Sequence, residues 1–145
     1  MKLRTKYHGE LDINENEIFH FENGIPGFLN EKQFVLLPLE DTPFIILQSV
    51  QTPALGFAMI DPFSYFLDYD IELDEQTVEQ LELSSEKDVA IYTILTVADP
   101  FDNTTANLQA PIVLNYEKKL GKQVILTNTP YQTKHRLFPE KAGVK

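Results

Sequence analysis

Residues 34–50 read Phe34-Val35-Leu36-Leu37-Pro38-Leu39-Glu40-Asp41-Thr42-Pro43-Phe44-Ile45-Ile46-Leu47-Gln48-Ser49-Val50. Two apolar runs, 34–39 and 44–50, are separated by a short polar linker. Runs of this length that stay apolar at successive positions are typical of strands buried on both faces, and the linker suits a loop. The stretch therefore predicts two neighbouring strands in the core of a β-rich fold.

Similar short runs, bounded by Pro, Gly, Asn and Asp, continue along the chain on both sides. The predicted strands are 3–13 with a turn or bulge at Gly9, 18–21, 55–60, 68–74, 89–97, and a hairpin of 106–114 and 123–127 around 116–122. Pro111 indicates an edge or bulge position in the first strand of that hairpin. One helix is predicted over 74–83, where Asp74 can act as the N-cap and Val78 and Leu81 form an apolar face.

This pattern predicts a mostly β protein, organised as a small antiparallel β-barrel-like or sandwich domain with one or two short helices. A chain of 145 residues, 43% of them hydrophobic, fits a single domain with a real core. We expect that domain to span 1–138 and a polar C-terminal tail to span 139–145.

The composition limits the classes of function. The chain has no cysteine, which excludes disulfides, thiolate catalysis and cysteine-bound metal. It shows neither a signal peptide nor an apolar run of membrane-spanning length, so we expect a soluble cytoplasmic protein without a membrane partner. The formal charge of −10 disfavours direct nucleic-acid binding and favours either a basic partner or simple solubility.

The negative charge is concentrated in one part of the chain. Between Asp61 and Asp88 lie ten of the 22 acids and a single cation, Lys87. Acids and apolar residues alternate without a break from Asp68 to Asp74, and a strand with this pattern would direct its carboxylates to one face and its apolar side chains to the other. The candidate interaction surface is this row with the start of the helix: Asp68, Asp70, Glu72, Asp74, Glu75 and Glu79.

The residues predict no catalytic, cofactor or metal site. The three histidines lack metal-ligand spacing, and Asp68-x-Asp70-x-Glu72 resembles a calcium loop only until its sixth position, where Leu73 replaces the glycine that the sharp turn needs. Nucleophile elbows and phosphate-binding glycine motifs are also absent. Gly24, Pro26, Gly27 and Phe28 are predicted to form a structural turn, with Phe28 capping the barrel.

Several motifs together resemble one known family. Phe21-Glu22-Asn23-Gly24-Ile25-Pro26-Gly27-Phe28 is similar to the signature F-x-x-G-[IL]-P-G-F of the FliW flagellar assembly factors. Leu47-Gln48-Ser49, Asp61-Pro62, the segment 105–112 and the segment 121–126 fit the same family in order and spacing. The resemblance covers about 7–137.

This resemblance implies a cytoplasmic, non-enzymatic regulator with a small β-barrel-like fold. Proteins of the family bind the flagellin monomer and, alternatively, CsrA, a repressor that blocks translation of flagellin mRNA. Because the resemblance implies CsrA as a partner, we expect the six acids of the candidate interaction surface to contact CsrA. The expected flagellin contact is weaker and rests on an edge-like Pro111 that leaves nearby backbone available: Asn107, Leu108, Gln109, Ala110 and Pro111.

Two other classes stay open at this point. A small acidic ligand-binding or enzymatic β-barrel would show a pocket with convergent polar groups and perturbed pKa values. A nucleic-acid module would need a basic face, which only the C-terminal segment 118–145 offers, since it holds seven of the 12 cations and one acid.

Overall fold

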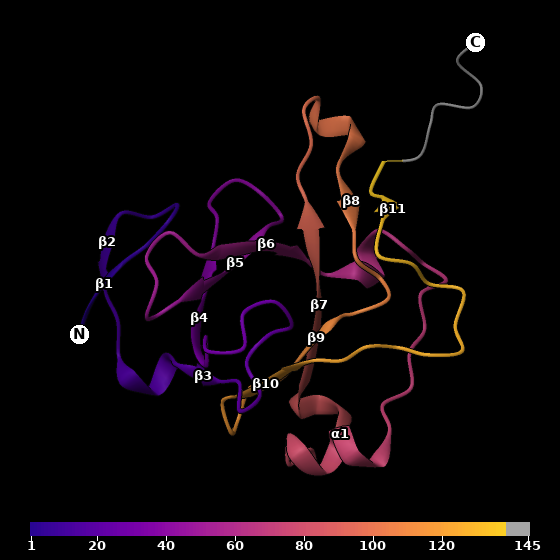
Figure 1. Ribbon diagram of the computed structural model, residues 1–145, viewed down its shortest axis with the longest axis horizontal. Coiled ribbons are helices and arrows are strands. Elements are labelled where there is room, and N and C mark those ends of the chain that lie inside the picture. The colour runs from indigo at the N-terminus through magenta and orange to yellow at the C-terminus, as the bar shows by residue number, and fades with distance from the viewer. Residues whose placement is uncertain (139–145) are drawn as a thin grey trace.

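The fold is a seven-stranded closed β-barrel. The computed structural model describes residues 1–138. Neighbouring strands in the ring follow the order β7-β6-β5-β4-β3-β10-β9, and β9 pairs again with β7, which closes it (Figure 1). The ring consists of β3 (Phe19–His20), β4 (Gln33–Pro38), β5 (Ile45–Ser49), β6 (Gly56–Ile60), β7 (Val89–Thr96), β9 (Ile112–Asn115) and β10 (Leu120–Gln123). The predicted mostly β, barrel-like single domain is confirmed.

Shorter elements surround the ring. A separate hairpin precedes it, and two short strands extend the sheet beyond β7. A single α-helix packs against the outside of the barrel at the bottom of Figure 1. These elements are β1 (Lys2–Arg4), β2 (Glu10–Asp12), β8 (Thr105–Ala106), β11 (His135–Arg136), α1 (Glu75–Gln80) and four 3-10 turns at 15–17, 62–64, 86–88 and 101–103.

The core explains why the two opening runs are apolar at successive positions. Phe34 and Leu47 point into the barrel, where they pack with Phe21 and Met59. Val35, next to Phe34, points outward and is also buried, because the β1–β2 hairpin covers that side of β4 and β5. Both faces of these strands therefore carry buried side chains, as predicted, while Leu36 and Ile45 are half-buried and Pro38 is exposed.

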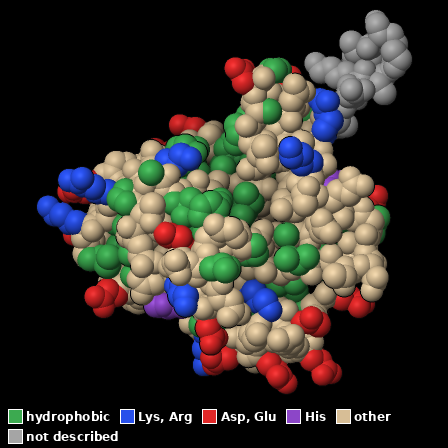
Figure 2. Space-filling model, in the orientation of Figure 1, with side chains coloured by type: hydrophobic (Ala, Val, Ile, Leu, Met, Phe, Trp, Pro, Cys, Tyr) green, Lys and Arg blue, Asp and Glu red, His purple; other side chains and the backbone are tan. Residues whose placement is uncertain are grey.

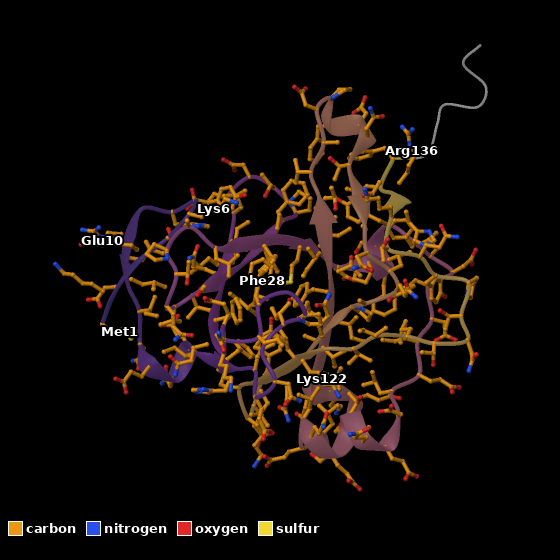
Figure 3. The ribbon with its side chains drawn as sticks, viewed as in Figure 1. Met1, Lys6, Glu10, Phe28, Lys122 and Arg136 are labelled. Atoms are coloured by element: carbon orange, nitrogen blue, oxygen red, sulfur yellow. The ribbon has the colours of Figure 1, made fainter. Side chains whose placement is uncertain are left out.

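The segment between β3 and β4 closes one end of the barrel. Gly24 and Gly27 have φ angles of +65° and +87°, and the Phe28 N–H donates to the Ile25 carbonyl at 2.6 Å. A Cβ on Gly24 would lie 2.5 Å from the Leu29 carbonyl oxygen, so this turn requires glycine. Phe28 packs edge-on against Phe57 at 5.4 Å between ring centroids and lies at the centre of the ring in the view of Figure 3.

Two local predictions were wrong in their bounds. Residues 3–13 form the β1–β2 hairpin and not one strand, while the turn predicted at Gly9 is confirmed, since its φ is +67°. The loop of the second hairpin is only Tyr116–Lys119, because β10 already begins at Leu120. The barrel is mostly antiparallel, as predicted, and its one parallel pairing joins β10 to β3 through Leu120 and His20. The predicted tail at 139–145 lies outside the described residues.

Candidate functional site

The acidic segment 68–74 is not a β-strand: Asp68 lies in a turn, and 69–74 have no regular secondary structure. Its alternation is real: Asp68, Asp70 and Glu72 are exposed, while Tyr69 is buried. The prediction of a strand was wrong because side chains, not a neighbouring strand, hold the segment. The Tyr69 hydroxyl donates to the Leu108 carbonyl at 2.8 Å, and the Asp70 N–H donates to the Tyr131 hydroxyl at 2.9 Å.

Helix α1 follows directly and begins as predicted. The Thr77 N–H donates to the Asp74 carboxylate at 2.8 Å, so Asp74 is the N-cap. Hydrogen bonds from Thr77 lower the pKa of Asp74. Glu75 and Glu79 remain exposed on the outer face of the helix. Asp74 therefore has a structural role that the other predicted acids do not share.

A buried asparagine fixes the end of α1 to the barrel. The Asn115 side chain is 1% exposed and lies at the end of β9. Its Nδ2 donates to the carbonyls of Leu81 and Glu82 at 2.7 and 3.2 Å, while its Oδ1 accepts from the N–H groups of Glu117 and Lys118. All the hydrogen-bonding groups of the amide are thus satisfied, and the helix carrying Glu75 and Glu79 is held against β9.

An open groove of about 650 Å³ separates the acidic segment and α1 from β7. Apolar side chains form most of its surface, and the carboxylates of Glu72 and Glu86 stand among them. Sequence reasoning identified Glu72 but did not connect it with Glu86 or with the apolar floor. The groove is lined by Ile71, Glu72, Leu73, Val78, Leu83, Ser85, Glu86, Val89 and Ile91.

The acids around this groove are largely uncompensated. The ion pairs formed within residues 1–138 lie at the N-terminal hairpin, and none involves an acid between Asp61 and Asp88. Figure 2 shows acidic side chains gathered at the bottom of the molecule, where Figure 1 places α1. Lys122 lies beside the helix, and its Nζ donates to the Gln80 side chain (Figure 3).

The five residues expected to contact flagellin are mostly buried. Leu108, Ala110 and Pro111 are buried, and Asn107 and Gln109 are half-buried. The premise that this backbone is available was wrong, because the Gln109 N–H, the Gln109 carbonyl and the Pro111 carbonyl are all hydrogen-bonded within the domain. The N–H groups of Leu126 and Val124 donate to these two carbonyls, and Ile125 between them has a side chain that is 59% exposed.

Within residues 1–138, no group of three or more His, Asp or Glu side chains is placed to hold a metal ion. The same residues include no helix long and apolar enough to cross a membrane. Raised pKa values occur at Tyr69 and Tyr92, in both cases mainly through burial. Tyr92 also shares a hydrogen bond of 3.0 Å with the Tyr116 hydroxyl.

The fold and this surface define a class: a small closed β-barrel whose most distinctive exterior feature is an acidic groove with an apolar floor. The chain belongs to the FliW family, whose model, described as "FliW protein", matches residues 2–137.

Known relatives extend over the same length. The chain is 74% identical over 143 residues to the flagellar assembly factor FliW of Geobacillus kaustophilus (strain HTA426), covering 99% of each chain. It is 52% identical over 141 residues to the protein of the same name from Bacillus subtilis (strain 168), covering 97% of this chain and 99% of the relative. A crystal structure of the flagellar assembly factor FliW superposes with a TM-score of 0.95 at 72% identity, covering 97% and 99% of the two chains.

Proposed function

We propose that this chain is a cytoplasmic, non-enzymatic flagellar assembly factor that binds flagellin and, alternatively, the translational repressor CsrA. Family membership and the description of its relatives as flagellar assembly factors support the first part. In the proposed cycle, free flagellin occupies the protein and releases CsrA, which represses flagellin translation. Secretion of flagellin frees the protein to capture CsrA, and translation resumes.

One observation carries the CsrA part of the proposal: the exposed acids of 68–79 have no ion-pair partners within the described residues. An RNA-binding repressor presents cations to phosphate, and an acidic surface complements such cations. The acids either cover the RNA-binding surface of CsrA or bind beside it and repel RNA. The apolar floor of the adjacent groove favours a protein partner over a small polar substrate.

Paired charge removal tests this surface. Asp68→Asn with Asp70→Asn, and separately Glu75→Gln with Glu79→Gln, should each weaken CsrA binding by roughly twofold to thirtyfold, the range that two exposed ion pairs supply. The dependence of the affinity on salt should also flatten. Asp74 is left intact because it caps α1.

A matched control separates local contact from net charge. Glu15→Gln with Glu40→Gln removes the same charge from exposed positions outside the groove. This control should bind CsrA like the unmodified chain. If the two double variants of the acidic surface also bind CsrA with unchanged affinity while they stay folded, the acidic surface is not the contact.

The flagellin contact at Asn107, Leu108, Gln109, Ala110 and Pro111 stays a proposal, with Ile125 added to it. An exposed isoleucine beside half-buried polar side chains offers apolar area to an amphipathic partner helix. Val124 and Leu126, on either side of it, pack with Leu81 of the α1 C-terminus. The two proposed contacts are thus joined by one apolar cluster, which supports mutually exclusive binding.

Ile125→Asp should lower flagellin affinity at least tenfold, because it places a charge in an apolar contact. Val97→Asp is the matched control, since Val97 is 56% exposed and directly follows β7. The exclusivity itself is tested by loading the protein with CsrA and adding flagellin monomer. Displacement of CsrA is expected, whereas a stable ternary complex, or binding of neither protein, contradicts the proposal.

A further inference from the structure

The first half of β7 has an unpaired edge. One edge of β7 is occupied along its length, by β9 at Val89–Tyr92 and by β8 at Leu95–Thr96. On the opposite edge, β6 pairs only with Thr93 and Ile94. β6 ends at Ile60, and the chain continues into the 3-10 turn at 62–64, which lies near β7 without pairing with it. Beside Val89–Tyr92, the described residues supply no strand on that side.

The direction of the backbone groups follows from one hydrogen bond. The Ile94 carbonyl accepts from the Asn107 N–H and therefore faces the β8–β9 side. Alternate residues of a strand direct their backbone groups to opposite edges, so Val89 and Ile91 face the open side. The Val89 N–H donates to the Glu86 carbonyl. Within residues 1–138, no strand pairs with Val89 or Ile91 on that side, and the N–H and C=O of Ile91 and the C=O of Val89 form no turn or loop hydrogen bond.

Both faces of this edge are hollowed. The groove of about 650 Å³ lies on one face, and a second groove of about 480 Å³ includes Ala90 and Tyr92, which point to the opposite face. Val89 and Ile91 line both grooves. An added strand would direct successive side chains into one groove and then the other. The second groove is completed by apolar residues and one acid: Pro43, Ile45, Asp61 and Phe63.

The charges at the edge specify the flanks of an occupant. The ionised side chains lining the two grooves are Glu72, Glu86 and Asp61, all of them acids. Lys87 follows Glu86 in the chain but does not line either groove. An apolar segment flanked by lysine or arginine complements this arrangement, and an acidic segment is repelled by it.

We propose that the Val89–Ile91 edge of β7 binds an extended, apolar peptide segment with basic flanks, contributed by a partner protein, as an added β-strand. The partner strand donates to the carbonyls of Val89 and Ile91 and accepts from the Ile91 N–H. Its apolar side chains fill the two grooves, and its cations lie near Glu72, Glu86 and Asp61. This mode depends on strand pairing and does not rest on the CsrA and flagellin contacts proposed above, although it shares Glu72 with the acidic surface.

Amide hydrogen exchange in the free protein tests the premise. The N–H groups of Ala90 and Tyr92 point toward β9, so their exchange should be slow, whereas the Ile91 N–H should exchange at least tenfold faster. Neighbouring amides of one strand thus act as internal controls. If the Ile91 amide exchanges as slowly as those of Ala90 and Tyr92, the proposal is overturned. A second copy of the chain that covers the edge would give this result.

The probe for binding is the capped peptide Lys-Lys-Val-Ile-Val-Lys-Lys, titrated to about 1 mM. We expect saturable binding with at least tenfold slower exchange of the Ile91 amide, and no change at Ala90 or Tyr92. The same peptide N-methylated at its three central residues lacks the strand donors and should bind at least tenfold more weakly. Equal binding of both peptides, no binding at 1 mM, or binding without protection of Ile91 overturns the proposal. A helix lying in the larger groove would give the last of these results.

Charge reversal on the protein gives a further test. Glu72→Lys with Glu86→Lys should weaken the peptide at least tenfold at low salt, while Glu15→Lys with Glu40→Lys, which changes the net charge equally elsewhere, should not. Equal loss in both variants would overturn the local charge assignment. Because the peptide is neither CsrA nor flagellin, these outcomes are separate from those that test the proposed function.

Discussion

Replacing Asn115 with aspartate should detach the C-terminal end of α1 from the barrel while leaving every surface acid in place. The substitution keeps the size of the side chain and the oxygen that accepts from Glu117 and Lys118. It removes the Nδ2 that donates to the carbonyls of Leu81 and Glu82. A carboxylate oxygen would then face these two carbonyls in a site that is 1% exposed.

The expected magnitude follows from those contacts. Two lost hydrogen bonds contribute about 1 kcal/mol each, and leaving buried acceptors unsatisfied beside a new charge adds about 1–3 kcal/mol. The free energy of unfolding should therefore fall by about 3–5 kcal/mol. Urea denaturation of both proteins at neutral pH measures this difference. If α1 positions the acidic surface, CsrA affinity should fall as well, although Glu75 and Glu79 are unchanged.

Gln123→Glu is the matched control, because it makes the same amide-to-acid change on the neighbouring strand. Gln123 is half-buried, and its Nε2 donates a single hydrogen bond, to the Ala110 carbonyl at 3.0 Å. We expect this control to lose about 1 kcal/mol. A loss for Asn115→Asp of less than about 1 kcal/mol, or no larger than that of the control, would refute the role assigned to Asn115.

Three further predictions concern stability. Gly121→Ala should lower the free energy of unfolding by about 1–3 kcal/mol, because the new Cβ would lie 2.5 Å from the Phe21 ring; Phe21→Leu in the same chain should recover part of this loss in urea denaturation. Because the pKa of Asp74 is lowered in the folded state, its carboxylate stabilises the fold above the unfolded-state pKa of 3.8, and this effect is lost as the pH falls through the folded-state value. The difference in unfolding free energy between the unmodified chain and Asp74→Asn should therefore change as the pH falls below about 4. Burial raises the pKa of Tyr69 and Tyr92, so their contribution to stability is present below the ordinary pKa of 10.0 and is lost above it. The free energy of unfolding, measured at increasing pH, should fall above about pH 10. It should fall less in Tyr92→Phe.

The elements that the sequence predicts best are those decided by local patterns. The runs at 34–39 and 44–50 become β4 and β5 because consecutive apolar residues need burial on both faces, wherever the partner strands lie. The helix start is also local, since the Asp74 carboxylate reaches the N–H three residues later. The turn at 24–28 adopts the positive φ angles that its glycines permit.

The elements that fail depend on distant residues. Alternation at 68–74 reports which side chains are buried, and any extended chain shows it, paired or not. Here the partner of Asp70 is a side chain, Tyr131, which lies 61 positions further along the chain. The open edge of β7 also cannot be predicted from the sequence, because it exists only where β6 stops at Ile60 and leaves Val89–Ile91 unpaired. For the acidic surface, the sequence predicts the exposed residues but not the apolar groove beside them.

The place of β10 in the ring has a consequence for synthesis of the chain. β10 lies between β3 and β9, so the first barrel strand has no partner on that side until residues 120–123 are made. A nascent chain whose residues up to 115 have left the ribosome holds six of the seven ring strands and still cannot close the barrel. Phe21, whose ring lies beside Gly121 of β10, lacks this neighbour until then, so the last steps of folding should wait for nearly complete translation.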